Sequence, residues 1–400
     1  MAERATVLGG HKKLRLPDAV AQSVGFMGPV FSSAFLIPLL VGVNASGNGA
    51  GAAAPLSVVI STIGVLGLGW IISEYARRIH AAGSLYDYVT DGLGTRIGAG
   101  AGFAYYGGIL ALGAAILVLI GGTIHDTLKA EFNIAPIPTI GWDLILLVGI
   151  GALLYAGVSL STRTQLVLAL VSLVVVTIFF VSVIVKVGSQ NSLSAFSPSA
   201  SPSGMKGILF GVLYGVLLFT GFETAANLGE ETEHPKRDIP RAVLFALLLA
   251  AGFYILASYA QVAGFHFSLK QISKAAAGPL FVLGSPAAQG GYGSDWIRRL
   301  LEMVVVLDML AVTSASRSRL LAASSPWPAT RAFPPGSPPS RPDARHQWAL
   351  PPWWWRSTRS SLPSPSGGPG SSRCHRHRIT PQCSAGWPPS APSPWPWSIC

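Results

Sequence analysis

Two glycine-containing segments interrupt long apolar stretches of this sequence. The first reads Gly25-Phe26-Met27-Gly28-Pro29, and the second reads Phe219-Thr220-Gly221-Phe222-Glu223. Glycine adopts backbone conformations that other residues avoid, and proline lacks a backbone donor, so each segment is predicted to break a helix. Inside a membrane, a broken helix leaves N–H and C=O groups free to bind the carboxylate and the amine of a small molecule. We therefore predict that these residues form a substrate site.

A second interpretation of the same residues is structural. Glycine and proline are common in membrane helices, where they serve packing and kinks. Either segment alone fits both interpretations. Their matching positions, five spans apart along the chain, favour the binding site.

Glu223 adds an ionisable group to the second segment. A carboxylate at membrane depth is costly, so we expect Glu223 to bond a polar group or the backbone inside the bundle rather than to contact lipid. Glu74 is a weaker candidate, because it ends a span beside Arg77 and Arg78 and an interfacial ion pair explains it.

Glu302 and Asp308 lie together near the end of the apolar region. Six residues correspond to about 600° of helical rotation, so the two carboxylates are predicted to point to different faces of one helix. Charged residues this deep usually face the bundle interior, and whether Asp308 faces the substrate cavity stays open at this point.

These residues require membrane-spanning helices to position them. Half of the chain is hydrophobic and only 11% is charged, whereas soluble domains carry about 25% charge. A span needs roughly 20 apolar residues. The sequence therefore predicts an all-α integral membrane protein of about eight transmembrane helices, with centres near Ser32, Gly64, Leu110, Gly149, Val176, Val216, Ala250 and Val305.

The distribution of Lys and Arg predicts the orientation. Loops that carry positive charge resist translocation. With the N-terminus inside, eleven of the Lys and Arg residues before Thr313 fall in the cytoplasm and seven fall outside. We predict a multi-pass protein of the cell (cytoplasmic) membrane with a cytoplasmic N-terminus, 1–17, followed by a transmembrane domain, 18–313.

The residues after about Thr313 have a different composition. Residues 314–400 hold 18 of the 30 prolines and eight of the 11 tryptophans, so we predict a low-complexity Pro/Ser/Arg/Trp-rich tail that is disordered. One interpretation is a native cytoplasmic tail. The other is a shift of reading frame in a GC-rich gene, which the tryptophan content favours, as does an eighth span that stops in mid-pattern.

Several function classes are excluded by what the apolar body lacks. Residues 1–313 hold 18 basic and 16 acidic residues, a balance of only +2, and no basic face predicts nucleic-acid binding. All three cysteines lie in the tail, where Cys374-His375-Arg376-His377 has no second pair to complete a metal site. No protease or esterase motif lies in a span. We predict no cofactor, no metal and no enzymatic activity.

Two further segments carry a resemblance to a known family. Residues 74–78 followed by 82–88, and the run 230–241, together with the two breaks, make residues 15–313 resemble the amino acid-polyamine-organocation (APC) permeases. The run 230–241 is the most specific, because its glutamates, proline, basic pair and Ile-Pro-Arg recur there in a fixed order. Physically it is a loop that ends with Pro240 as the first residue of the next helix.

The resemblance implies a fold and a mechanism. It implies twelve helices in a broken-helix inverted-repeat (five-plus-five) arrangement with two extra helices, so a chain with about eight spans is an incomplete, C-terminally truncated or frame-shifted form. Some members place a lysine in the middle of helix five for proton coupling, but here that span has only Lys186, at its end. The aromatic gate of some members corresponds to Phe219 or Phe222.

We therefore expect residues 18–313 to be a permease domain that performs secondary active transport of an amino acid or related amine by alternating access. The expected partners are that small-molecule substrate, a coupling proton or counter-substrate, and the lipid bilayer. Two alternatives remain open, namely an inactive or regulatory remnant of such a permease and, less favoured, an intramembrane enzyme or channel.

The frame-shift interpretation predicts the content of the DNA beyond about codon 313. Another frame should complete the eighth span and then encode four more apolar spans of roughly 20 residues each. Sequencing the locus through that junction tests this expectation. If no other frame is open and apolar, the tail is native, and its peptides should then appear on proteolysis of the purified protein.

Overall fold

The computed structural model describes residues 13–43, 48–79, 85–134, 136–155, 162–275 and 278–324. Within these ranges the chain is helical, with one isolated β-bridge between Leu14 and Thr232. The start of the chain and residues 325–400, which include all three cysteines, lie outside the described residues. The predictions about the far N-terminus and the tail therefore stay predictions.

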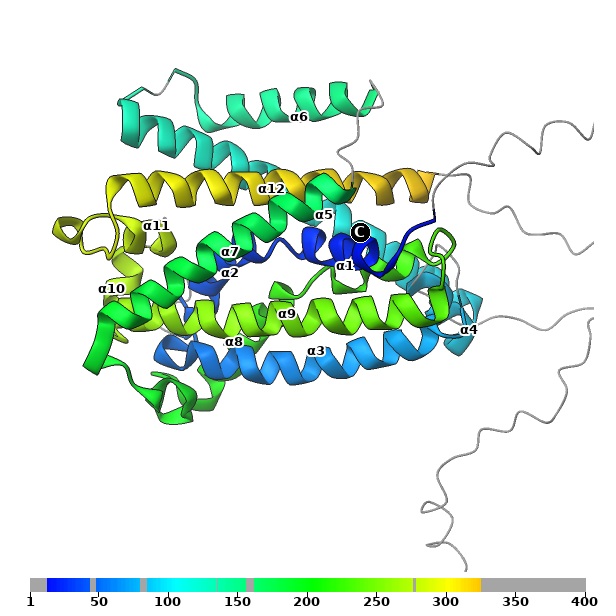
Figure 1. Ribbon diagram of the computed structural model, residues 1–400, viewed down its shortest axis with the longest axis horizontal. Coiled ribbons are helices and arrows are strands. Elements are labelled where there is room, and N and C mark those ends of the chain that lie inside the picture. Colours follow the sequence, from blue (N-terminus) through cyan, green and yellow to red (C-terminus); the bar gives the residue numbers. More distant parts are fainter. Residues whose placement is uncertain are drawn as a thin grey trace, which may run out of the picture. The chain divides into compact units, whose positions relative to one another are not determined.

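Twelve α-helices and six short 3-10 helices are described in these ranges (Figure 1). The α-helices are α1 (Leu16–Met27), α2 (Pro29–Val41), α3 (Ala54–Ala76), α4 (Leu85–Leu93), α5 (Thr95–Phe132), α6 (Thr139–Tyr155), α7 (Thr162–Val187), α8 (Gly204–Leu218), α9 (Pro235–Gly264), α10 (Leu269–Lys274), α11 (Pro279–Gly284) and α12 (Asp295–Ser324). The 3-10 helices are η1 (Gly51–Ala53), η2 (Gly188–Gln190), η3 (Leu193–Phe196), η4 (Pro198–Ala200), η5 (Phe222–Leu228) and η6 (Ala287–Gln289).

Six helical segments of the described chain are long and apolar enough to cross a membrane, where about eight were predicted. They are Leu16–Val41, Gly51–Ala76, Thr95–Lys129, Val167–Gln190, Gly204–Leu228 and Pro235–Gly264. The predicted spans around Gly149 and Val305 are helices too, but they fall short of this standard. The part of α6 over which an apolar helix is described, Thr139–Gly149, is too short for it, and α12 carries five charged side chains between Asp295 and Asp308.

The interrupted helices lie at the centre of the bundle. α1 packs against α7, α9, η5 and α12, while α2 packs against α8, α9 and α12. Figure 1 shows α12, α9 and α3 running along the same direction and α7 crossing them obliquely, with α1 and α2 between α12 and α9. α6 packs on α5 at the edge of the bundle. The breaks are therefore enclosed by other helices.

The outward faces of the helices are apolar. Large hydrophobic side chains are exposed on several helices, including Trp70, Val148, Val185, Leu213 and Leu248. A contiguous apolar exterior of this kind is unfavourable in water and favourable in lipid. The exterior and the buried centre together support a membrane-embedded bundle.

Three helix boundaries differ from the sequence-based expectations. α9 begins at Pro235, and Pro240 lies inside it, so the prediction that Pro240 starts the helix is wrong. Proline is favoured at the first helical position because its missing N–H has no partner there, and Pro235 already occupies that position. α12 continues to Ser324, past the boundary expected at Thr313, and the connection after α3 contains the short helix α4.

Small residues allow α3 and α8 to approach closely. The Ser57 hydroxyl donates to the Ile208 carbonyl at 3.1 Å, and the Ser61 hydroxyl lies 3.2 Å from the Val212 carbonyl. A Cβ atom added to Gly211 would lie 2.8 Å from the Ala50 Cβ. Membrane helices commonly associate through such small-residue contacts and interhelical hydrogen bonds.

This contact predicts the effect of enlarging one glycine. Gly211→Val should destabilise the protein by roughly 1–3 kcal/mol, because the added methyl groups separate α3 from α8. The apparent midpoint of thermal unfolding in detergent measures the change. Gly64→Val is the matched control, since an added Cβ at Gly64 meets nothing within 4 Å. Equal midpoints for the two variants would contradict this account of the α3–α8 contact.

Candidate functional site

The first predicted break lies between α1 and α2. α1 ends at Met27, Pro29 is the first residue of α2, and Gly28 between them has φ 51° and ψ 66°. This left-handed conformation is costly for any residue with a Cβ atom. The Ser32 hydroxyl donates to the Met27 carbonyl at 2.9 Å, which satisfies one of the groups that the break leaves free. The predicted helix break is confirmed.

The second predicted break lies between α8 and η5. α8 ends at Leu218, the chain turns through Phe219 and Thr220, and Gly221 has φ 110°. The chain then continues as a 3-10 helix rather than as an α-helix. Since 3-10 and α-helical hydrogen bonds differ in spacing, the carbonyl and amide groups at this junction lack regular helical partners. This break is confirmed as well.

The two breaks contact each other although they lie far apart in the sequence. The Ser23 hydroxyl donates to the Phe222 carbonyl at 2.7 Å and accepts from the Ala225 N–H at 3.1 Å. A Cβ atom on Gly221 would collide with the ring of Phe26. An added Cβ at Gly25, by contrast, would meet nothing within 4 Å. The structure therefore brings the two predicted segments together and leaves open space beside Gly25.

Glu223 is held inside the bundle by two hydrogen bonds. Its carboxylate is buried, with 6% of the residue exposed. One oxygen accepts from the Tyr105 hydroxyl of α5 at 3.0 Å, and the other accepts from the Gly221 N–H at 3.1 Å. The prediction that Glu223 bonds a polar group and the backbone rather than lipid is confirmed. Glu223 thereby links the second break to α5.

The aromatic residues of the second break occupy different surroundings. Phe219 is buried, and its ring meets that of Tyr254 from α9 edge to face, with centroids 5.2 Å apart. Phe222 is also buried, in contact with the core, whereas Thr220 is half-buried. Both aromatic candidates for a gate thus lie on the inner side of the bundle.

Asp308 lies at the first break. It is completely buried, and one of its oxygens accepts from the Phe31 N–H of α2 at 2.8 Å. Glu302 points elsewhere and pairs with Arg298 at 3.0 Å, so the prediction of two different faces is confirmed. The sequence left the orientation of Asp308 open, and it did not single out Ser23, Tyr105 or Tyr254. The available signal for each was a polar side chain within an apolar span.

The predicted loop 230–241 contacts the start of the described chain. Leu14 exchanges two backbone hydrogen bonds of 2.9 Å with Glu231 and Glu233, and Arg15 pairs with Glu233 at 3.4 Å. Exposed ion pairs contribute little by themselves, so the backbone bonds define this contact. Glu74 likewise forms the expected exposed pairs, at 3.9 Å from Arg77 and 3.1 Å from Arg78.

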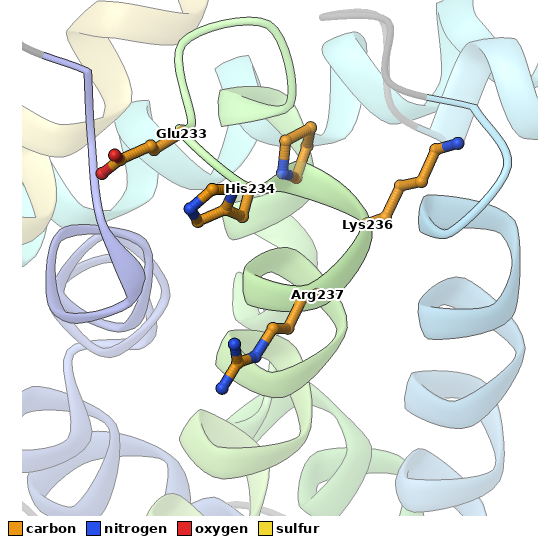
Figure 2. A pocket seen from close by; sticks show the side chains of 5 residues that line it. Glu233, His234, Lys236 and Arg237 are labelled. Carbon is orange, nitrogen blue, oxygen red and sulfur yellow. The ribbon is translucent and has the colours of Figure 1, made fainter.

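A shallow hollow of about 540 Å³ lies at the amino end of α9. Figure 2 shows that Lys236 points away from Glu233 and His234 there, and the lining also includes Pro235 and Arg237. None of these residues belongs to the two breaks, so this hollow is separate from the candidate site. Within the described part of the chain, no cluster of three or more His, Cys, Asp or Glu could hold a metal ion.

Comparisons with known proteins agree with this architecture. The family model for amino acid permeases matches residues 24–317. The branched-chain amino acid permease BcaP of Bacillus subtilis is 23% identical over 67% of this chain and 58% of its own length. The vacuolar cationic amino acid transporter 8 of Arabidopsis thaliana is 30% identical over 53% of this chain and 37% of its length. The methylthioribose transporter of Bacillus subtilis is 28% identical over 53% of this chain and 47% of its own length. The chain thus spans about half the length of the curated relatives it matches.

The Glu223 contacts predict a difference between two substitutions. Glu223→Ala should destabilise the protein by about 1–3 kcal/mol, because the buried Gly221 N–H and Tyr105 hydroxyl lose their partner. Glu223→Gln should remain near the wild-type midpoint, since its carbonyl accepts from Gly221 and its amide donates to the Tyr105 oxygen. Thermal unfolding in detergent measures both. Glu74→Ala is the control, as it removes an exposed carboxylate. An equal loss of stability in Glu74→Ala and Glu223→Ala would contradict the stabilising role of the buried Glu223 hydrogen bonds.

Proposed function

Because the chain belongs to the amino acid permease family, we propose that it carries an amino acid or related amine across the membrane by secondary active transport with alternating access. The family consists of transporters and not of enzymes. The observation that supports the proposal most directly is the contact between the two helix breaks, since midplane binding sites of such carriers form between discontinuous helices.

The proposed binding site consists of the residues of both breaks. From the first they are Gly25, Phe26, Met27, Gly28 and Pro29, and from the second Phe219, Thr220, Gly221, Phe222 and Glu223. The substrate would occupy the open space beside Gly25, with its polar ends on backbone groups and its side chain against the aromatic rings. The five-plus-five inverted repeat is part of this proposal. It is supported by the position of the two breaks. If the long apolar helical segments are counted along the chain with α6 included, one break lies within the first segment and the other within the sixth.

The names of the relatives suggest which substrates to test. One relative is a branched-chain amino acid permease, another a cationic amino acid transporter and a third a methylthioribose transporter. Leucine and arginine are therefore the first two probes. We propose the cytoplasmic membrane as the location, with the N-terminus inside, residues 18–313 as the transport unit, residues 314–400 as a low-complexity tail, and a proton or a counter-substrate as the coupling partner.

The alternative to transport is an inactive or regulatory remnant of such a permease, which could bind a substrate without carrying it across the membrane. Carriers of this kind bind the substrate at the interface between two repeats. Uptake into vesicles separates the two functions.

The transport proposal predicts concentrative uptake by the reconstituted chain. Proteoliposomes should accumulate labelled leucine or arginine, with saturation and with counterflow on preloading. Saturation and counterflow distinguish a carrier from a channel. Binding of either probe without uptake would support the remnant, and absence of both binding and uptake with all the common amino acids would contradict the proposal.

The site assignment predicts the effect of filling each break. Gly28→Leu and Gly221→Leu should each weaken binding at least about tenfold. A side chain at Gly221 collides with Phe26 of the other break, a side chain at Gly28 collides with Val312 beside Asp308, and both strain a left-handed backbone. Leucine favours membrane insertion, so expression should persist. Gly252→Leu is the matched control, since an added Cβ at Gly252 meets nothing within 4 Å. Near-native binding by both break variants would refute the site.

A further inference from the structure

The amino end of α2 lies inside the bundle, where its first N–H groups need partners. Pro29 has no N–H, and the Ser32 N–H donates to the Gly28 carbonyl at 2.8 Å. The N–H groups of Val30 and Phe31 are therefore the ones that face outward from this end. Such an end attracts anions, because the N–H groups and the helix dipole both favour negative charge.

A carboxyl group of the protein itself already occupies this end. The Phe31 N–H donates to one oxygen of the Asp308 carboxylate at 2.8 Å, and the Val30 N–H also lies close to that carboxylate. Gly28 permits this approach, since a Cβ atom there would lie 3.3 Å from the same oxygen and would collide with Val312. The N–H groups that an incoming substrate carboxylate would use at the first break are thus taken by Asp308.

In this position only one of the two Asp308 carboxyl oxygens accepts a hydrogen bond. Asp308 is completely buried, and its second oxygen has no hydrogen-bond partner among the described residues. The hydroxyl of Tyr254 is also buried without a partner of normal geometry, although the Ser32 side chain and the charge of Asp308 both lie nearby. Two polar groups with spare hydrogen-bonding capacity therefore lie near the amino end of α2. A buried polar group that lacks a hydrogen bond is costly.

The titratable and charged groups on the surrounding helices leave Asp308 without a countercharge. Among the described residues, no Lys or Arg side chain forms an ion pair or a hydrogen bond with it. Its own helix carries Asp295 and Arg299, together with Arg298 and Glu302, which pair with each other. On the helices packed against it lie groups that include Lys186 of α7, which bonds the Tyr292 carbonyl, Tyr105 of α5, which bonds Glu223, and Asp18 of α1, and the Tyr254 hydroxyl of α9 lies nearby. Among the described residues, the N–H groups and the dipole of α2 are therefore what would stabilise a negative charge on Asp308.

From this arrangement we infer that Asp308 is a built-in competitor of the substrate carboxylate, released from the amino end of α2 by binding a proton. The proton comes from a hydronium ion of the solvent: one O–H bond forms on a carboxylate oxygen, one O–H bond of the hydronium breaks, and water is left. The other bonds lost are the hydrogen bonds to α2. Loss of the charge weakens those bonds, because charge-assisted hydrogen bonds are about twice as strong as neutral ones. The freed N–H groups then accept the substrate carboxylate, and proton and substrate are bound together. This inference rests on the proposed transport function for its second step but not for its first.

The first step can be measured without any ligand. Hydrogen exchange on the purified full chain in lipid nanodiscs gives the protection factor of the amides of Val30 and Phe31. Between about pH 8 and about pH 5, wild-type protection should fall at least about tenfold. Asp308→Asn should give low protection at both pH values. Glu302→Gln, which removes another carboxylate from α12, should behave as wild type. A wild-type protection factor that does not change with pH overturns the inference, even if the variants fail to fold.

The second step is measured by binding of paired probes. Leucine and arginine carry a carboxylate, whereas 3-methylbutylamine and agmatine are the same molecules without it. Affinity for the amino acid that binds should fall at least about tenfold from about pH 5 to about pH 8, while affinity for its amine should not follow that profile. Asp308→Asn should remove the pH dependence. If affinity for the amine and for the amino acid depends on pH in the same way, the inferred competition between Asp308 and the substrate carboxylate is overturned. A pH-dependent protection factor without binding of either amino acid refutes the transport proposal instead and leaves the proton-linked release standing.

Discussion

The structure depends on a single constraint, which is that polar backbone groups inside a membrane bundle must find partners in the protein. Regular helices satisfy this requirement internally, but a broken helix does not. Each break here therefore needs side chains from other helices. Ser23 of α1 bonds the second break and Asp308 of α12 bonds the first. Glu223 accepts from the Gly221 N–H of its own break and from the Tyr105 hydroxyl of α5. The need to satisfy the breaks thus determines which helices lie at the centre.

The same constraint explains why the outer helices have a simpler composition. α6 and the outward faces of α3, α7 and α8 contact no break, so their exposed side chains need only to be apolar. Close packing of small residues positions these helices against each other, as in the close approach of Gly211 to Ala50 and Ser57. Buried polar contacts of α1, α2, η5 and α12 gather at the two breaks, and these contacts are the basis for proposing a ligand with charged ends there.

The sequence alone supported part of this picture, and the reason lies in which interactions are local. The breaks at Gly28 and Gly221 follow from backbone chemistry at those residues, and the apolar spans follow from length. The partner of Phe31 does not, because Asp308 is 277 positions away and only the packing of α12 on α2 brings them together. The start of α9 was placed wrongly for a local reason, since two prolines competed for one role and Pro235 took it. Only tertiary geometry shows that Tyr105 serves Glu223.

The two carboxylates at the breaks differ in a way that bears on function. Glu223 uses both oxygens, one on the backbone of its own break and one on Tyr105, so it fixes the second break to α5. Asp308 uses one oxygen on α2, and within the described part of the chain its other oxygen has no partner. A group held from two sides resists displacement more than a group held from one, because moving it forfeits more hydrogen bonds. Of the two breaks, the first is consequently the one at which the inferred exchange of an internal carboxylate with a ligand would cost fewer hydrogen bonds, while the carboxylate of the second break is held more firmly.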